Sequence, residues 1–125
     1  MMSWRSALGP HGGAELDLEE SVSGNSRIVA VKGDVDLSTS ERFGAVLKRL
    51  AGEPGDGIVV DLTNCAFIDS SGLAAIVHAA SRRDGFRIVG GHGPPSEVLQ
   101  MTAIDQTIPV HDTLDEALSA ARSRS

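Results

Sequence analysis

The run Ile58-Val59-Val60 constrains the fold most, because three successive residues are apolar. Alternating apolar and polar residues mark a strand with one exposed face, whereas an unbroken apolar run is typical of a strand buried on both faces. The segment 86–91, FRIVGG, is predicted to be another short buried strand. Such strands occur in largely parallel sheets that helices cover, so the sequence predicts an α/β fold.

A segment with the period of an amphipathic helix lies upstream of this run. Its apolar residues recur at i, i+3, i+4 and i+7, and they are Phe43, Val46, Leu47 and Leu50. Ser38 and Glu41 have the spacing of a capping box at the start of this helix. Gly52 and Pro54 are residue types that end helices, so the helix is expected to stop there.

The other segments extend the alternation of strand and helix along the chain. Residues 14–22 and 26–37 alternate in part and are expected to form two strands joined by a turn. The further predicted strands cover 57–69, 86–91 and 107–112, and the further predicted helices start at Ser70 and cover 94–104 and 113–123. The helix from Ser70 has an apolar stripe of Leu73, Ile76, Val77 and Ala80. The last helix begins with a capping box of Thr113 and Glu116. This order predicts a single domain with a mixed, largely parallel sheet and helices packed on it.

Charge and composition exclude several kinds of partner. The net charge is −6, from 11 basic and 17 acidic residues, and the sequence has no cluster of Lys and Arg that would bind a phosphate backbone. No apolar run approaches the roughly 18 residues of a membrane span. Residues 1–13 lack the apolar region of a secretion signal and are predicted to be a disordered lead-in. We therefore expect a cytoplasmic domain over residues 14–122, with no nucleic-acid or membrane partner.

Two polar segments follow predicted strands. The first is GDVDLST, residues 33–39, and the second is IDSSG, residues 68–72. Functional side chains collect at the carboxyl ends of strands in open α/β sheets, so the two segments are expected to lie side by side. The serines of the second segment have two interpretations. Ser70 or Ser71 caps the following helix, or one of them carries a phosphate that the helix N-terminus favours.

Residues 59–77, VVDLTNCAFIDSSGLAAIV, resemble the signature of the STAS domain in its anti-sigma factor antagonist branch. GDVDLST resembles the Gly-Glu-Leu-Asp element of that family, and the resemblance extends over residues 14–121. It implies a mixed sheet with helices packed on it. It also implies a partner that is both an anti-sigma factor and a serine kinase. Members sequester this partner while unphosphorylated, which frees the sigma factor, and the kinase inactivates them by phosphorylating a serine.

The resemblance also assigns roles to residues of this chain. The acceptor is the first hydroxyl residue after the aspartate of the motif, which is Ser70 here. Asp69 matches that aspartate, Asp36 matches an aspartate near the acceptor, and Asp34 replaces a glutamate that is usual in the family. The partner-binding and switch site is accordingly expected to comprise Asp34, Asp36, Ser38, Thr39, Asp69, Ser71, Gly72 and Leu73.

The predicted function is that of an anti-sigma factor antagonist that phosphorylation of Ser70 switches off. The chain is expected to be a monomer or weak dimer and not an enzyme, with no cofactor and no metal. The rival function within the same fold is a STAS scaffold or an accessory subunit of a stressosome or lipid-transport complex. A phosphatase resting on Asp34 and Asp36 would need further loops, and a serine hydrolase would need a G-x-S-x-G motif.

The cysteine and the histidines are given structural interpretations. Cys65, the single cysteine, suits a reducing compartment and is expected to fill the core, with a redox switch as the alternative. The histidines lack metal-ligand spacing and are expected to be ordinary surface or loop residues; they are His11, His78, His92 and His111.

Overall fold

A mixed sheet of six strands organises the computed structural model, which describes residues 16–123. The strands run in the order β1-β2-β3-β5-β6, and β4 pairs with β2 beyond the end of β3. The strands are β1 (Asp17–Ser23), β2 (Ser26–Val35), β3 (Gly57–Asp61), β4 (Cys65–Ile68), β5 (Phe86–Val89) and β6 (Val110–His111). The helices are α2 (Ser40–Ala51), α3 (Ser70–Ala80), α4 (Pro94–Met101) and α5 (Leu114–Ser123), with a 3-10 turn, η1 (Ile104–Gln106).

The pairing of the strands confirms the predicted mixed, largely parallel sheet. β1 and β2 form an antiparallel hairpin. Its turn contains Gly24, whose φ of 60° is readily adopted only by glycine and a few polar residues. All other pairs are parallel, namely β2 with β3, β2 with β4, β3 with β5 and β5 with β6. Every parallel connection therefore crosses over the sheet, and helices cover both of its faces.

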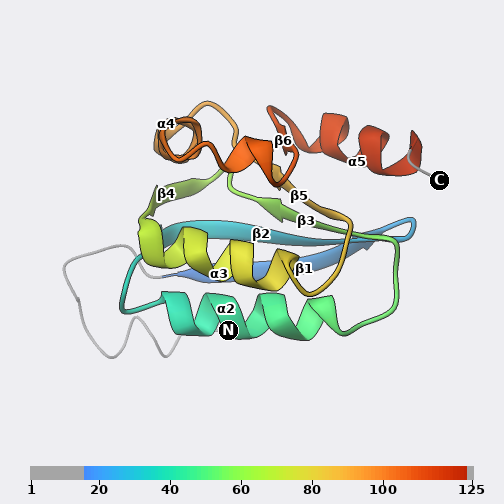
Figure 1. The fold of residues 1–125 in the computed structure, drawn as a ribbon, viewed down its shortest axis with the longest axis horizontal. Coiled ribbons are helices and arrows are strands. Elements are labelled where there is room, and N and C mark those ends of the chain that lie inside the picture. Colours follow the sequence, from blue (N-terminus) through green and yellow to red (C-terminus); the bar gives the residue numbers. More distant parts are fainter. Residues whose placement is uncertain (1–15, 124–125) are drawn as a thin grey trace, which may run out of the picture.

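The two faces of the sheet carry cores of different size. α2 and α3 pack together beneath one face, and α5 lies on the other (Figure 1). The larger core includes Val60, with the α2 residues Phe43 and Leu47. The smaller core, under α5, is formed by Ile28, Val59, Val89 and Ala117. Val59 and Val60 are both fully buried but belong to opposite cores, which confirms a strand buried on both faces.

The prediction of one strand over 57–69 was wrong, because this segment forms two strands, β3 and β4. The chain leaves β3 at Asp61, whose carboxylate accepts hydrogen bonds from the backbone N–H of Thr63 at 3.0 Å and from the Thr63 hydroxyl at 2.5 Å. The Cys65 N–H then donates to the Leu62 carbonyl at 3.0 Å. These local hydrogen bonds turn the chain, and β4 pairs with the far end of β2.

The predicted lead-in, residues 1–13, lies outside the described residues, so the domain limits 14–122 stay a prediction. Within residues 16–123, no helix is both long enough and apolar enough to cross a membrane.

Candidate functional site

The turn after β2 is organised by Asp36. Its carboxylate accepts the Ser38 N–H at 2.9 Å and the Ser38 hydroxyl at 2.7 Å, and its carbonyl accepts the N–H of Ser40 at 2.8 Å. The Ser38 hydroxyl holds the pKa of Asp36 below its ordinary value. The predicted capping box of Ser38 and Glu41 is therefore wrong. Asp36 engages Ser38, and α2 begins after Thr39 with no side-chain cap.

Thr39 closes the same turn from its other end. Its hydroxyl donates to the Asp34 carbonyl at 2.9 Å and accepts the Asp36 N–H at 2.9 Å. The side chains of Asp34, Asp36 and Thr39 are half-buried, whereas Ser38 is exposed. The turn is thus fixed by its own polar groups, and it presents Leu37 outward with 81% of its surface exposed.

Asp69 is the N-cap of α3. Its backbone is extended, and its carboxylate accepts the N–H groups of Ser71 at 2.9 Å and Gly72 at 3.3 Å. The expectation that a serine caps this helix was wrong, because the carboxylate before the serines reaches the first-turn N–H groups. Asp69 therefore has a structural task that the sequence pattern did not reveal.

The N-terminal ends of α2 and α3 lie beside each other. Val35 and Ile68 pair in the parallel register of β2 and β4, and the Asp69 N–H donates to the Val35 carbonyl at 3.1 Å. Asp36 and Asp69 are the next residues of the two strands. The structure thus brings the two predicted polar segments together at one edge of the sheet, as expected from the carboxyl ends of adjacent strands.

The two serines of α3 differ in their surroundings. The Ser71 side chain is half-buried, and its hydroxyl donates to the Asp69 carboxylate at 2.5 Å. Ser70 is exposed, and its hydroxyl makes no hydrogen bond to any residue of the described range 16–123. Asp69 therefore engages one hydroxyl and leaves the other available to solvent.

Gly72 and Leu73 are buried beneath the first turn of α3. A Cβ at Gly72 would lie 2.6 Å from Val35 Cγ1 and 2.7 Å from Ile68 Cγ1, so α3 approaches the sheet here as only glycine allows. Leu73 is 6% exposed and belongs to the larger core. These two predicted site residues support the position of Ser70 from beneath and do not line the surface.

The outer face of α3 continues the exposed surface from Ser70. Ala74 and Val77 follow at i+4 and i+7, and Val77 is 41% exposed. The prediction that Val77 belongs to the buried stripe was wrong, because Leu73, Ile76 and Ala79 fill the inner face. Sequence reasoning also missed Leu37, although a lone apolar residue in a polar turn is a signal for exposure.

Cys65 has the buried position that the sequence predicted. It is 3% exposed, and its thiol donates to the Phe67 carbonyl at 3.2 Å. Burial raises the pKa of the thiol, and the nearby Asp34 charge raises it further. A protonated, buried thiol is a poor nucleophile, which disfavours the alternative of a redox switch.

The described histidines are dispersed. His78 and His92 are exposed, and His111 is half-buried with a ring nitrogen 3.1 Å from Arg87. Burial and the Arg87 charge lower the pKa of His111. Within residues 16–123, no three side chains of His, Cys, Asp or Glu gather as a metal site would require. His11 lies outside the described residues.

Replacing the cap of α3 should lower stability. We expect Asp69→Ala to reduce the free energy of unfolding by about 1 kcal/mol, because two N–H groups lose their acceptor. Asp69→Asn is the matched control, since an amide oxygen caps nearly as well, and it should stay within about 0.5 kcal/mol of the parent. Urea denaturation measures both variants. Equal losses in the two variants would show that the charge, not the cap, stabilises α3.

Fold and site together define a small α/β protein with a polar site where two helices begin at one edge of a mixed sheet. The family model of the STAS domain matches residues 17–117. The chain belongs to the STAS domain family.

Solved structures of the same fold come from proteins of more than one kind. An anti-sigma factor antagonist from Mycobacterium paratuberculosis superposes with a TM-score of 0.83 at 23% identity, over 86% of this chain and 95% of that one. The anti-sigma factor antagonist SpoIIAA in its unphosphorylated form gives 0.66 at 18% identity, over 89% and 99%. A sulfate transporter family protein from Wolinella succinogenes gives 0.67 at 18% identity, over 82% and 89%. At these identities the likeness concerns the fold alone.

Proposed function

We propose that this protein is an anti-sigma factor antagonist whose binding surface surrounds Ser70. The observation that carries the proposal is the contrast between the two serines. Ser71 is held by Asp69, whereas Ser70 is exposed and its hydroxyl is free of hydrogen bonds within the described residues. A kinase needs an accessible hydroxyl at a fixed place, and the first turn of a capped helix provides one. The names of two structural neighbours, both anti-sigma factor antagonists, support the same function.

The partner-contacting surface has an apolar centre and acidic neighbours. Leu37 projects from the turn after β2, and Ala74 and Val77 continue the surface along α3. Exposed apolar side chains next to polar groups are typical of protein interfaces. Asp36 and Asp69 flank the surface, but their carboxylates are engaged within the protein by the hydroxyls of Ser38 and Ser71, so the partner is expected to contact the apolar centre.

Phosphorylation of Ser70 would change the charge of this surface and leave the fold intact. A phosphoserine carries about −1.5 to −2 charges at neutral pH. Ser70 follows the Asp69 carboxylate directly, so the added charge meets a like charge at the site. The field of the α3 N-terminus offsets part of this repulsion within the protein. A partner whose acidic or apolar surface closes over Ser70 has no such compensation, so the modification acts on affinity.

The second candidate function is a STAS scaffold or an accessory subunit without an anti-sigma partner. This second candidate is supported by the sulfate transporter family protein, which has the same fold and superposes on this chain about as well as SpoIIAA does. On this alternative the exposed surface of α3 contacts a permanent partner, and Ser70 stays unmodified.

Phosphopeptide mass spectrometry of the protein from its own host tests the proposal. Trypsin releases residues 50–82 as one peptide, which contains both Ser70 and Ser71. Fragment ions distinguish the two, and growing and stressed cells provide the comparison. We expect phosphate on Ser70 with an occupancy that changes between the conditions, and none on Ser71. A peptide that stays unmodified in both conditions would move the assignment to the scaffold or accessory subunit.

A further inference from the structure

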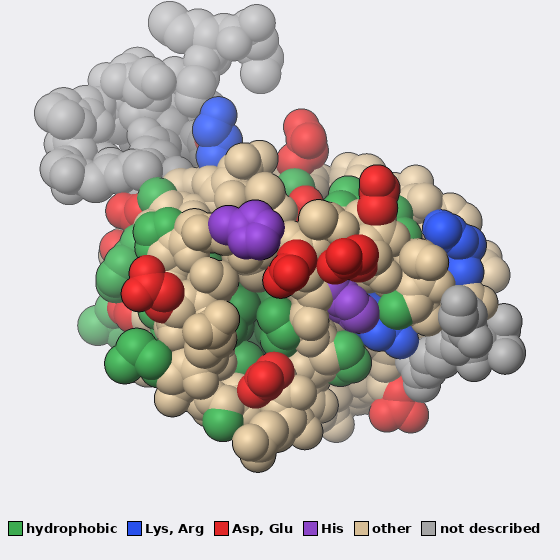
Figure 2. Space-filling view, turned by 90° about the horizontal axis from the view of Figure 1, so that it is seen from above, with side chains coloured by type: hydrophobic (Ala, Val, Ile, Leu, Met, Phe, Trp, Pro, Cys, Tyr) green, Lys and Arg blue, Asp and Glu red, His purple; other side chains and the backbone are tan. Residues whose placement is uncertain are grey.

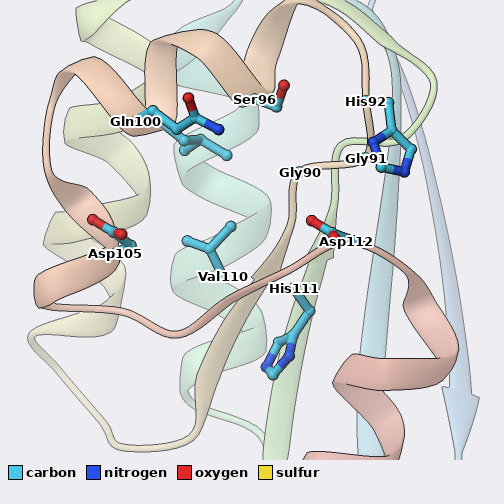
Figure 3. Close-up of a pocket in the computed structure, with 10 residues that line it drawn as sticks. Gly90, Gly91, His92, Ser96, Gln100, Asp105, Val110, His111 and Asp112 are labelled. Carbon is cyan, nitrogen blue, oxygen red and sulfur yellow. The ribbon is translucent and has the colours of Figure 1, made fainter.

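A cavity of about 430 Å³ opens at the carboxyl ends of β5 and β6. It lies between the loop after β5, the inner side of α4 and the residues that follow β6 (Figure 3). This volume lies in the range of about 300–1,000 Å³ that is usual for small-molecule sites. The place is also usual, because ligands of open α/β sheets bind outside the carboxyl ends of the strands. None of the residues that line it belongs to the Ser70 surface.

Gly90 lies at the base of the cavity, where neighbouring side chains pack close to its backbone. A Cβ at this position would lie 3.1 Å from Leu99 Cδ1, 3.6 Å from Val110 Cγ1 and 3.7 Å from Ser96 Cβ, and all three residues line the cavity. A side chain at residue 90 would therefore press against these lining residues, Leu99 above all. The Gly90 N–H donates to the His111 carbonyl at 2.9 Å, which ties the floor to β6. The base of the cavity is thus partly apolar and is tied to the end of the sheet.

The rim of the cavity is polar and acidic. Asp105 and Asp112 lie on opposite sides of Val110, and Gln100 lies above it (Figure 3). In Figure 2, which views this face, acidic and histidine side chains surround a hollow in which apolar side chains are visible. Arg87 is the neighbouring cation, and it contacts the ring of His111. The two carboxylates thus give the rim an excess of negative charge.

The first residues of α4 do not offer free N–H groups that would attract an anion against this negative charge. Its first two residues, Pro94 and Pro95, have no N–H group. The Ser96 N–H donates to the Gly93 carbonyl at 3.0 Å, and the Ser96 hydroxyl donates to the same oxygen at 2.8 Å. A phosphate or carboxylate would therefore find no free N–H donor on Pro94, Pro95 or Ser96, and it would face Asp105 and Asp112. A protonated amine meets acceptors on the rim and apolar surface on the floor.

We propose that this cavity binds a small molecule with a short apolar body and a protonated amino group. The apolar body contacts Leu99 and Val110 at the base of the cavity. The amino group lies at the rim, where the Asp112 carboxylate accepts its hydrogen bond. This site is additional to the Ser70 surface and does not depend on the function proposed for it.

A matched series of ligands tests the proposal on the whole chain. Hexylamine, hexan-1-ol and hexanoate share one apolar body and differ in charge at pH 7. Each ligand is titrated at low ionic strength while the amide chemical shifts are recorded. The shifts of residues 90–92, 96–100 and 110–112 should change. We expect hexylamine to bind about three- to fivefold more tightly than hexan-1-ol, the scale of one exposed charge pair, and hexanoate to bind most weakly. Hexanoate that binds as tightly as hexylamine overturns the proposal.

Three variants separate this cavity from general attraction to an acidic protein. Asp112→Asn should reduce hexylamine binding about three- to fivefold and leave hexan-1-ol unchanged. Glu41→Gln removes the same charge from the exposed side of α2 and should change neither. Gly90→Ala should weaken binding of all three ligands, because its methyl group would displace the Leu99 side chain, which lines the cavity. If Asp112→Asn and Glu41→Gln have the same effect, or if the shifts appear outside the cavity, the proposal is wrong. Ser70→Ala should bind the series as the parent does.

Discussion

Ser70→Asp is expected to weaken binding of the anti-sigma factor partner at least about 100-fold, while Ser70→Ala stays within about threefold of the parent. Ser70 is exposed at the first position of α3, next to the Asp69 carboxylate. A second negative charge there opposes closure of the partner, and like charges that meet in an interface cost several kcal/mol. A factor of 100 corresponds to about 2.7 kcal/mol, which lies within that range. Titration calorimetry with the purified anti-sigma factor of the host measures both affinities.

Ser21→Asp provides the control for charge alone. Ser21 is exposed on β1, away from the carboxyl ends of β2 and β4, and this variant has the same net charge as Ser70→Asp. Its affinity should equal that of the parent. If Ser70→Asp binds as tightly as Ser70→Ala, the switch assigned to Ser70 is wrong. If Ser21→Asp weakens binding equally, the effect comes from net charge and not from the site.

Gly72→Ala is expected to lower the free energy of unfolding by about 1–3 kcal/mol, the usual cost of overpacking a core. The added Cβ would lie 2.6 Å from Val35 and 2.7 Å from Ile68, far inside contact distance. Both neighbours are β-branched, are at most 1% exposed and have little rotamer freedom to move aside. α3 must therefore shift away from β2 and β4, which also displaces Ser70. Urea denaturation at one pH measures the loss.

Gly44→Ala is the matched substitution with the opposite expected sign. Gly44 lies in α2, and a Cβ there would be 3.5 Å from the Ala75 Cβ, an ordinary contact. Replacing a glycine by alanine inside a helix then raises the free energy of unfolding by about 0.5–1 kcal/mol. If both variants change stability by the same amount in the same direction, helix propensity decides the result. The close approach of α3 to the sheet would then have no energetic role.

Much of the fold could be predicted because burial leaves a periodic trace along the chain. Ile58 to Val60 are apolar without alternation, and the structure places Val59 and Val60 in the cores on opposite faces of the sheet. The helical period over Phe43, Leu47 and Leu50 predicted α2, and all three residues are buried. The α/β class and the mixed sheet follow from such patterns, because the hydrophobic effect acts on every residue according to its type.

The approximate place of the candidate site was also predictable. The segments 33–39 and 68–72 each combine polar residues with the end of an apolar strand, and parallel strands bring such ends to one edge. The pairing of Val35 with Ile68 places them side by side. What the sequence determined is therefore the fold class, the buried faces of most elements and the edge of the sheet where polar residues gather.

Only the tertiary structure decided which polar group engages which. Asp69 caps α3 and accepts a hydrogen bond from the Ser71 hydroxyl, so Ser70 is the serine left exposed. Asp36 accepts a hydrogen bond from the Ser38 hydroxyl, so Ser38 does not form the predicted capping box. Several side chains near a helix start can make these hydrogen bonds, and the choice depends on positions to within a few tenths of an ångström. Leu99 and Val110 come from distant segments and meet at Gly90 only in the folded chain. Such contacts leave no period in the sequence.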